Sequence, residues 1–130
     1  MKTQIRAAVF LALSLLLNSG GDAATFRVEM VSGHEYSPSY LEIQMGDTVE
    51  FVNTTGVKHT VTADPLLVDN PTDVILPEGA LTFDSGKLDK EQSFSHTFDL
   101  PGLYQYVCLP HQRHMKGQIM VLPPVPVTEE

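Results

Sequence analysis

Short strand-like runs of apolar residues, most of them alternating with polar ones, limit this chain to a β-rich fold. They occupy residues 26–30, 41–45, 49–51, 57–63, 94–98, 103–108 and 118–122. When apolar and polar residues alternate, one face of a strand points toward a core and the other face points toward solvent. Turn residues separate the runs, and no helix-period segment of useful length occurs. The pattern therefore predicts an all-β fold, a sandwich or a barrel.

Residues 64–92 interrupt this pattern with clustered turn signals such as Asn70-Pro71 and Asp84-Ser85-Gly86. The segment is long for a connection inside a compact domain, so we expect it to carry short strand or turn structure of its own. Apolar residues within it, among them Val68 and Val74, indicate that it packs down on the sandwich.

The two ends of the chain differ in character from its centre. Lys2 and Arg6 precede an apolar run over residues 7–17, and small residues follow, which is typical of a secretory signal peptide over residues 1–23. The run is too short to span a bilayer, which takes about 20 apolar residues. We therefore expect an exported protein with a single domain over residues 24–122 and no membrane insertion. The Pro-rich, acidic residues 123–130 are expected to form an extended tail.

The charge balance narrows the choice of partners. The whole chain has a formal net charge of −8, and removing residues 1–23 takes away Lys2, Arg6 and Asp22, which leaves −9. An excess of negative charge argues against binding to nucleic acid or to anionic membranes. It favours encounters with positively charged partners.

Cys108 is the only cysteine, and it lies in a short segment rich in metal-binding side chains. An exported chain with one cysteine cannot form an internal disulfide, so the thiol needs another role. His111 follows Cys108 after the two-residue gap Leu109-Pro110, and Met115 lies four residues after His111. Cys, His and Met on one loop, together with a distant His, are the ligands of a blue-copper site. Zn²⁺ is a weaker match because Met is a poor zinc ligand.

Several histidines compete for the remaining positions. His59 lies among β-forming residues and is the best upstream candidate, whereas a packed histidine is the alternative reading. His34, in a polar loop, is expected to face solvent, and His96 is expected to pack beside Phe94 and Phe98. His114 is an alternative to His111, although the compact gap after Cys108 favours His111.

With these candidate ligands, the sequence resembles cupredoxins of the plastocyanin, pseudoazurin and amicyanin group. The matching segments are residues 38–53, 59–64, 83–86 and 98–108 together with the loop to Met115. The resemblance implies a Greek-key β-sandwich with one type 1 copper ion at one end, cycling between Cu(I) and Cu(II). It implies His59, Cys108, His111 and Met115 as the metal ligands. It also places Tyr104 at a tyrosine corner and makes Asn53 a candidate neighbour of the site.

The loop departs from the family pattern between its histidine and its methionine. Plastocyanin-like loops usually place four residues there and amicyanin-like loops two, whereas this chain has Gln112, Arg113 and His114. The length of this loop bears on the axial distance and the reduction potential. Arg113 and His114 are expected to give the ligand end a locally positive character.

These observations predict a protein that carries one electron at a time and is not an enzyme. Family members carry single electrons between larger redox proteins, so the resemblance implies transient docking to a c-type cytochrome or to an oxidase or reductase. We expect a monomer in the periplasm, with the thylakoid lumen or the extracellular space as alternatives. A copper storage or delivery protein is the alternative function, but no Met-rich or His-rich tract supports it.

Overall fold

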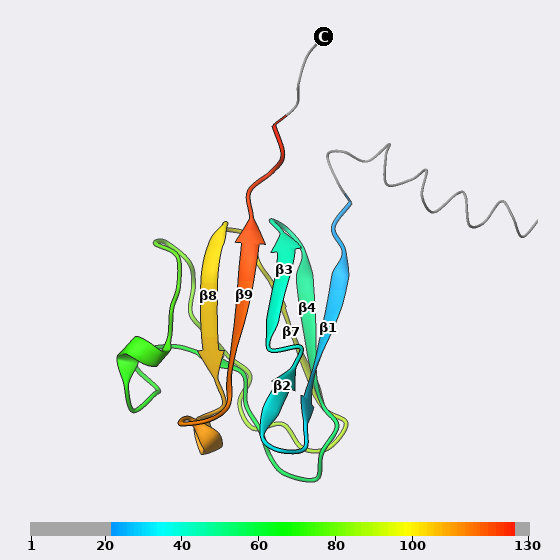
Figure 1. Cartoon of the computed structure of the whole chain (residues 1–130), viewed down its shortest axis with the longest axis vertical. Helices are drawn as coiled ribbons and strands as arrows, with labels where there is room; N and C mark the ends of the chain where they lie inside the picture. Colours follow the sequence, from blue (N-terminus) through cyan, green and yellow to red (C-terminus); the bar gives the residue numbers. More distant parts are fainter. Residues whose placement is uncertain (1–21, 127–130) are drawn as a thin grey trace, which may run out of the picture.

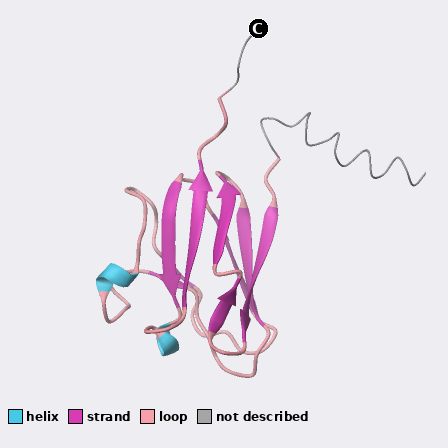
Figure 2. Ribbon diagram, viewed as in Figure 1, coloured by secondary structure: helices cyan, strands magenta, loops and turns pink. Residues whose placement is uncertain are grey.

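The computed structural model describes residues 22–126, which form a sandwich of two β-sheets (Figures 1 and 2). This confirms the expected all-β, Greek-key architecture. The predicted signal peptide falls on residues outside the described part of the chain, apart from Asp22 and Ala23. Between residues 22 and 126, no helix is long and apolar enough to cross a membrane.

Nine strands and two short 3₁₀ helices follow one another along the described chain. They are β1 (Thr25–Val31), β2 (Glu35–Ser37), β3 (Tyr40–Gln44), β4 (Thr48–Asn53), β5 (Thr62–Ala63), η1 (Pro71–Asp73), β6 (Phe83–Asp84), β7 (Ser93–Thr97), β8 (Gly102–Val107), η2 (Leu109–His111) and β9 (Lys116–Leu122). Most of these strands lie where the alternating pattern predicts them. The short strand β2 was not predicted, since three residues are too few to show a period.

One sheet has the strand order β2-β1-β4-β7 and the other β3-β9-β8-β5-β6. β1 runs parallel to β4 and β3 runs parallel to β9, while the other pairs are antiparallel. The chain therefore crosses between the sheets, as in a Greek key. β1 and β8 end at the lower end of the sandwich in Figure 1, where β9 begins. Loops from both sheets meet at that end.

The inner faces of both sheets supply a continuous apolar core. Its largest fully buried side chains include Tyr106, Phe51, Phe98, Met30, Ile43 and Ile119. The ring of Tyr106 meets Tyr36 edge-on at 4.8 Å and Phe51 at 5.3 Å between centroids. Aromatic pairs prefer such edge-to-face contacts. These rings fill the interior next to the end of β8.

Residues 64–92 carry short structure of their own, as expected, in the form of η1 and β6. Val74, Leu76 and Ala80 pack against the core, and Val68 is buried. Leu66 is 90% exposed, so the apolar residues of this segment do not all pack on the sandwich.

The prediction of one strand over residues 57–63 was wrong. Only Thr62 and Ala63 form β5, while His59 makes an isolated bridge to Leu88. The reason is that side chains take the intervening amide protons. The Thr60 N–H donates to the Cys108 sulfur and the Val61 N–H donates to Ser85 Oγ. These two N–H groups are therefore not available for the hydrogen-bond ladder of a regular β-strand.

Tyr104 forms the expected tyrosine corner, because its hydroxyl donates to the Leu100 carbonyl at 2.9 Å. Tyr106, two residues later, packs against the backbone of the neighbouring strand at Gly117. A Cβ atom at Gly117 would lie 2.4 Å from the Tyr106 hydroxyl. The tyrosine ring and this glycine thus fit together without room for a larger residue.

We predict that Gly117→Ala destabilises the protein by about 1–3 kcal/mol, the usual cost of overpacking a core. The variant forces the buried Tyr106 ring to move. Urea denaturation measures the free energy of unfolding. Gly56→Ala is the matched control, since nothing lies within 4 Å of a Cβ there. Equal stability of the two variants would show that the ring moves at no cost.

Candidate metal centre

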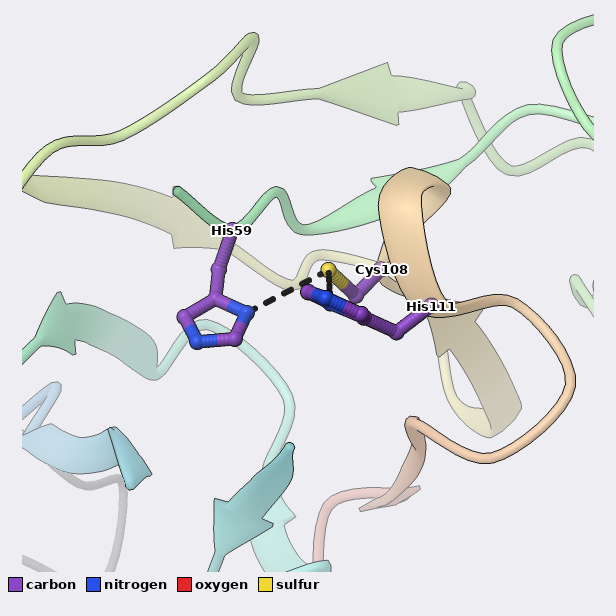
Figure 3. Close-up of side chains that lie close together, drawn as sticks. All are labelled: His59, Cys108 and His111. Atoms are coloured by element: carbon purple, nitrogen blue, oxygen red, sulfur yellow. Dashed lines mark hydrogen bonds between the residues drawn. The ribbon is translucent and has the colours of Figure 1, made fainter. Parts of the chain in front are cut away.

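Three of the predicted ligand side chains converge at the lower end of the sandwich. The ligand atoms of His59, Cys108 and His111 all lie within 4.8 Å of one another. The Cys108 sulfur lies 3.5 Å from Nδ1 of His59 and 3.3 Å from Nδ1 of His111. Figure 3 shows both imidazole rings turning a nitrogen toward the sulfur. Two nitrogens and one sulfur therefore face a common point.

Cys108 and His111 are brought together by the turn that follows β8. Pro110 cannot continue a central strand because it lacks an N–H, and the chain enters η2 directly after Cys108. The His111 N–H donates to the Cys108 carbonyl at 3.0 Å. This single turn returns the imidazole to the side of the thiol.

His59 is held by a pair of backbone hydrogen bonds to the segment before β7. The His59 N–H donates to the Leu88 carbonyl at 3.2 Å, and the Leu88 N–H donates back at 2.8 Å. The buried Asn53 amide donates to the carbonyls of Val57 and Leu88, at 2.8 and 2.9 Å. Asn53 thus fixes both sides of the bridge that carries His59, which agrees with its expected place beside the site.

Thr60 ties the His59 segment to the Cys108 loop. Its N–H donates to the Cys108 sulfur at 3.4 Å, and its hydroxyl accepts from the Leu109 N–H at 2.9 Å. The Tyr36 hydroxyl donates to the Thr60 carbonyl at 2.7 Å. Three hydrogen bonds at one residue therefore set the position of the sulfur relative to His59.

Met115 closes the loop that carries Cys108 and His111. Its N–H donates to the His111 carbonyl at 2.9 Å, and its carbonyl accepts from the Cys108 N–H at 3.1 Å. Its side chain is fully buried. The backbone of the loop is therefore anchored at both ends around the site.

The other histidines lie outside the three-residue cluster. His114 is exposed, in the turn before Met115. His96 contacts Phe83 and Phe98, with ring centroids 4.1 and 4.7 Å away. It is a packing residue, as predicted.

His34 is exposed, as expected, but its contact with the site was missed. Its ring stacks on His111 with the centroids 3.8 Å apart and the planes 16° apart. Nothing in the local sequence indicates this contact, because the two residues belong to separate loops. The polar Ser32-Gly33-His34 turn showed only that the residue lies at the surface.

Burial sets the protonation of the cluster. It lowers the pKa of His59, with smaller contributions from His111 and His34, and it lowers the pKa of His111, with contributions from His34 and His114. Both imidazoles are thus biased toward the neutral form, which is the form that binds a metal. Burial raises the pKa of the Cys108 thiol, although hydrogen bonds from Thr60 and His111 oppose the shift. A bound cation would have to displace the thiol proton.

The donors fit a soft or borderline transition metal. A thiolate and two imidazoles, without a carboxylate, suit copper better than magnesium or calcium. His59 Nε2 is buried and has no hydrogen-bond partner among the described residues. Its Nδ1 atom faces the Cys108 sulfur at 3.5 Å, so the geometry makes Nδ1 the nitrogen directed at a metal.

Comparison with known proteins identifies relatives over most of the chain. The model of copper binding proteins of the plastocyanin/azurin family matches residues 23–122. A chloroplastic plastocyanin from Physcomitrium patens is 34% identical over 127 residues, which cover 93% of this chain and 71% of the relative. The solved structure of a pseudoazurin from Sinorhizobium superposes with a TM-score of 0.61 at 30% identity, covering 78% of this chain and 76% of that one.

A copper-containing nitrite reductase from Thermus scotoductus also contains this fold. Its structure superposes with a TM-score of 0.62 at 33% identity over 78% of this chain. The match covers only 23% of the nitrite reductase. The likeness is therefore to one part of a larger protein.

We predict that Asn53→Ala loosens the His59 bridge before it affects the rest of the sandwich. The substitution removes one hydrogen bond from each of two carbonyls, which keep one other donor each, at a total cost of about 1–3 kcal/mol, and about 1.4 kcal/mol corresponds to a tenfold change. Amide hydrogen exchange of His59 and Leu88 should accelerate about five- to 150-fold in the metal-free protein. Amides of β1 and β4 that exchange only by local opening serve as the internal reference. Equal acceleration at all of these amides would contradict a local role for Asn53.

Proposed function

Because the chain belongs to the plastocyanin/azurin family of copper-binding proteins, we propose that it carries single electrons between redox partners. The observation that supports this most directly is the convergence of Cys108 Sγ with the Nδ1 atoms of His59 and His111. We assign these three residues as the main copper ligands and Met115 as the weak axial ligand. Copper supplies the one-electron chemistry, since it is stable as Cu(I) and as Cu(II).

The chain's own residues favour electron transfer because they hold the donor set rigidly. His59, Cys108 and Met115 are fully buried, and backbone hydrogen bonds fix each of their segments. When the ligand geometry is nearly the same for Cu(I) and Cu(II), the ligands move little as an electron is transferred. A storage or delivery protein would instead need an open site that exchanges metal quickly, so we rank that function second.

An enzymatic role for the thiol has less support. Cys108 has no exposed surface, and burial raises the pKa of its thiol, whereas a nucleophilic cysteine needs access and a lowered pKa. His111 is the ligand nearest solvent, beside a hollow of about 510 Å³ that Leu109, Pro110 and Arg113 help to line. We propose this surface as the place where electrons enter and leave.

The partners are proposed to be redox proteins, such as a c-type cytochrome or an oxidase or reductase. They would dock transiently, because weak electron-transfer complexes use small interfaces. We further propose that residues 1–23 direct export and are removed, that residues 24–122 form the copper domain, and that residues 123–130 form a tail. The periplasm is the proposed compartment for a monomeric protein.

The first test is a Cu(II) titration of the purified protein followed by visible absorption. We expect an intense thiolate-to-copper band that saturates at one equivalent and bleaches reversibly on reduction with ascorbate. Cys108→Ser should remove the band and leave the fold, which far-ultraviolet circular dichroism checks. A blue Cys108→Ser variant would disprove the ligand assignment. Preference for Cu(I) without redox cycling would favour storage or delivery.

Met115→Leu tests the axial position. The change removes a donor to Cu(II), so we expect copper to remain bound while the reduction potential rises. Each tenfold loss of Cu(II) affinity relative to Cu(I) raises the potential by about 59 mV. Protein-film voltammetry measures the shift. Met45→Leu, in the exposed turn after β3, is the control. An unchanged potential in Met115→Leu would exclude the axial role.

A further inference from the structure

His111, the partly buried imidazole of the metal centre, lies against a second imidazole, that of His34 in a turn of the other sheet. The His34 ring stacks on His111 with its centroid 3.8 Å away and lies edge-on to His59 at 5.9 Å. His34 comes from the turn between β1 and β2, whereas His111 belongs to η2. The contact joins two loops that are far apart in the sequence.

The turn places this ring on the site through an uncommon backbone conformation. Gly33 and His34 both have positive φ angles, 90° and 59°. Residues other than glycine rarely adopt such angles, although asparagine, aspartate and histidine do so more often than most. The flanking pairs Val31–Glu35 and Met30–Tyr36 hold the turn in register. Tyr36, in turn, donates to the Thr60 carbonyl, so the turn is tied to the site at a second point.

His111 is the ligand that most needs such a support. His59 is fully buried, whereas His111 is only partly buried beside the surface hollow that His34 also lines. Rotation of the His111 side chain toward solvent would carry its Nδ1 away from the Cys108 sulfur. The same rotation would separate the two stacked rings.

We propose that His34 is a positioning residue, whose ring holds His111 in the orientation in which Nδ1 faces Cys108. The consequence is slower loss of copper, because the metal leaves toward solvent only after its most exposed ligand has swung away. This inference rests on the proposed function, since it takes copper as the ligand. Stacked aromatic pairs contribute enough to change such a rate about two- to tenfold.

Copper release from the reduced protein tests the proposal. The Cu(I) form is mixed with an excess of a Cu(I)-selective chelator, and the release rate is measured from the absorbance of the chelate. His34→Asn removes the ring but keeps a residue that tolerates positive φ, and His34→Phe keeps a ring on a less suitable backbone. We expect release about two- to tenfold faster in His34→Asn and within twofold of the original in His34→Phe.

These two variants separate the ring from the backbone. A backbone effect alone would give the opposite order, with His34→Phe releasing copper faster than His34→Asn, and would overturn the proposal. Equal rates in both variants and the original protein would overturn it as well. His114→Ala, which removes another exposed imidazole near the hollow, is the matched control and should release copper at the original rate.

A measurement without metal distinguishes failure of this inference from failure of the proposed function. In the metal-free protein, the ring protons of His111 should show an upfield ring-current shift in the NMR spectrum that His34→Asn removes and His34→Phe retains. Absence of this shift would contradict the stacking. Absence of the thiolate-to-copper band in the original protein would instead contradict the proposed function, whatever the NMR result.

Discussion

The position of the metal centre depends on the hydrogen bonds made by Thr60. Its N–H reaches the Cys108 sulfur, its hydroxyl accepts from the Leu109 N–H, and its carbonyl accepts from Tyr36. The residue thus joins the His59 segment, the cysteine loop and strand β2. A buried donor or acceptor without a partner is costly, so displacing any of these segments would leave several polar groups unsatisfied. The hydrogen bonds that position the metal ligands are for this reason the same ones that hold these segments of the sandwich together.

The sequence predicted most strands and the ligand loop for the same physical reason, which is that both are local. Alternation within β1, β3, β4 and β8 reflects contacts that each strand makes through its own two faces. The spacing of Cys108 and His111 fits a single turn, and that turn is η2. These features need no knowledge of the rest of the chain.

What the sequence did not show depends on partners far along the chain. Residues 57–61 resemble a strand, but the Thr60 and Val61 amides are taken by Cys108 and Ser85, which no local pattern indicates. The stacking of His34 on His111 likewise requires two loops from different sheets to meet. A polar turn predicts exposure and gives no information about which neighbour the exposed ring touches.

The place of the last strand in the sheet has a consequence for the order of folding. β9 lies between β3 and β8, so the C-terminal strand fills the interior of its sheet and not an edge. During synthesis β3 and β8 have no partner between them until residue 122 has emerged, and pairing between such distant segments is slow. The sheet β3-β9-β8-β5-β6 can therefore be completed only once β9 is available. The β2-β1-β4-β7 sheet needs no residue after Thr97, so its strands can pair before those of the other sheet.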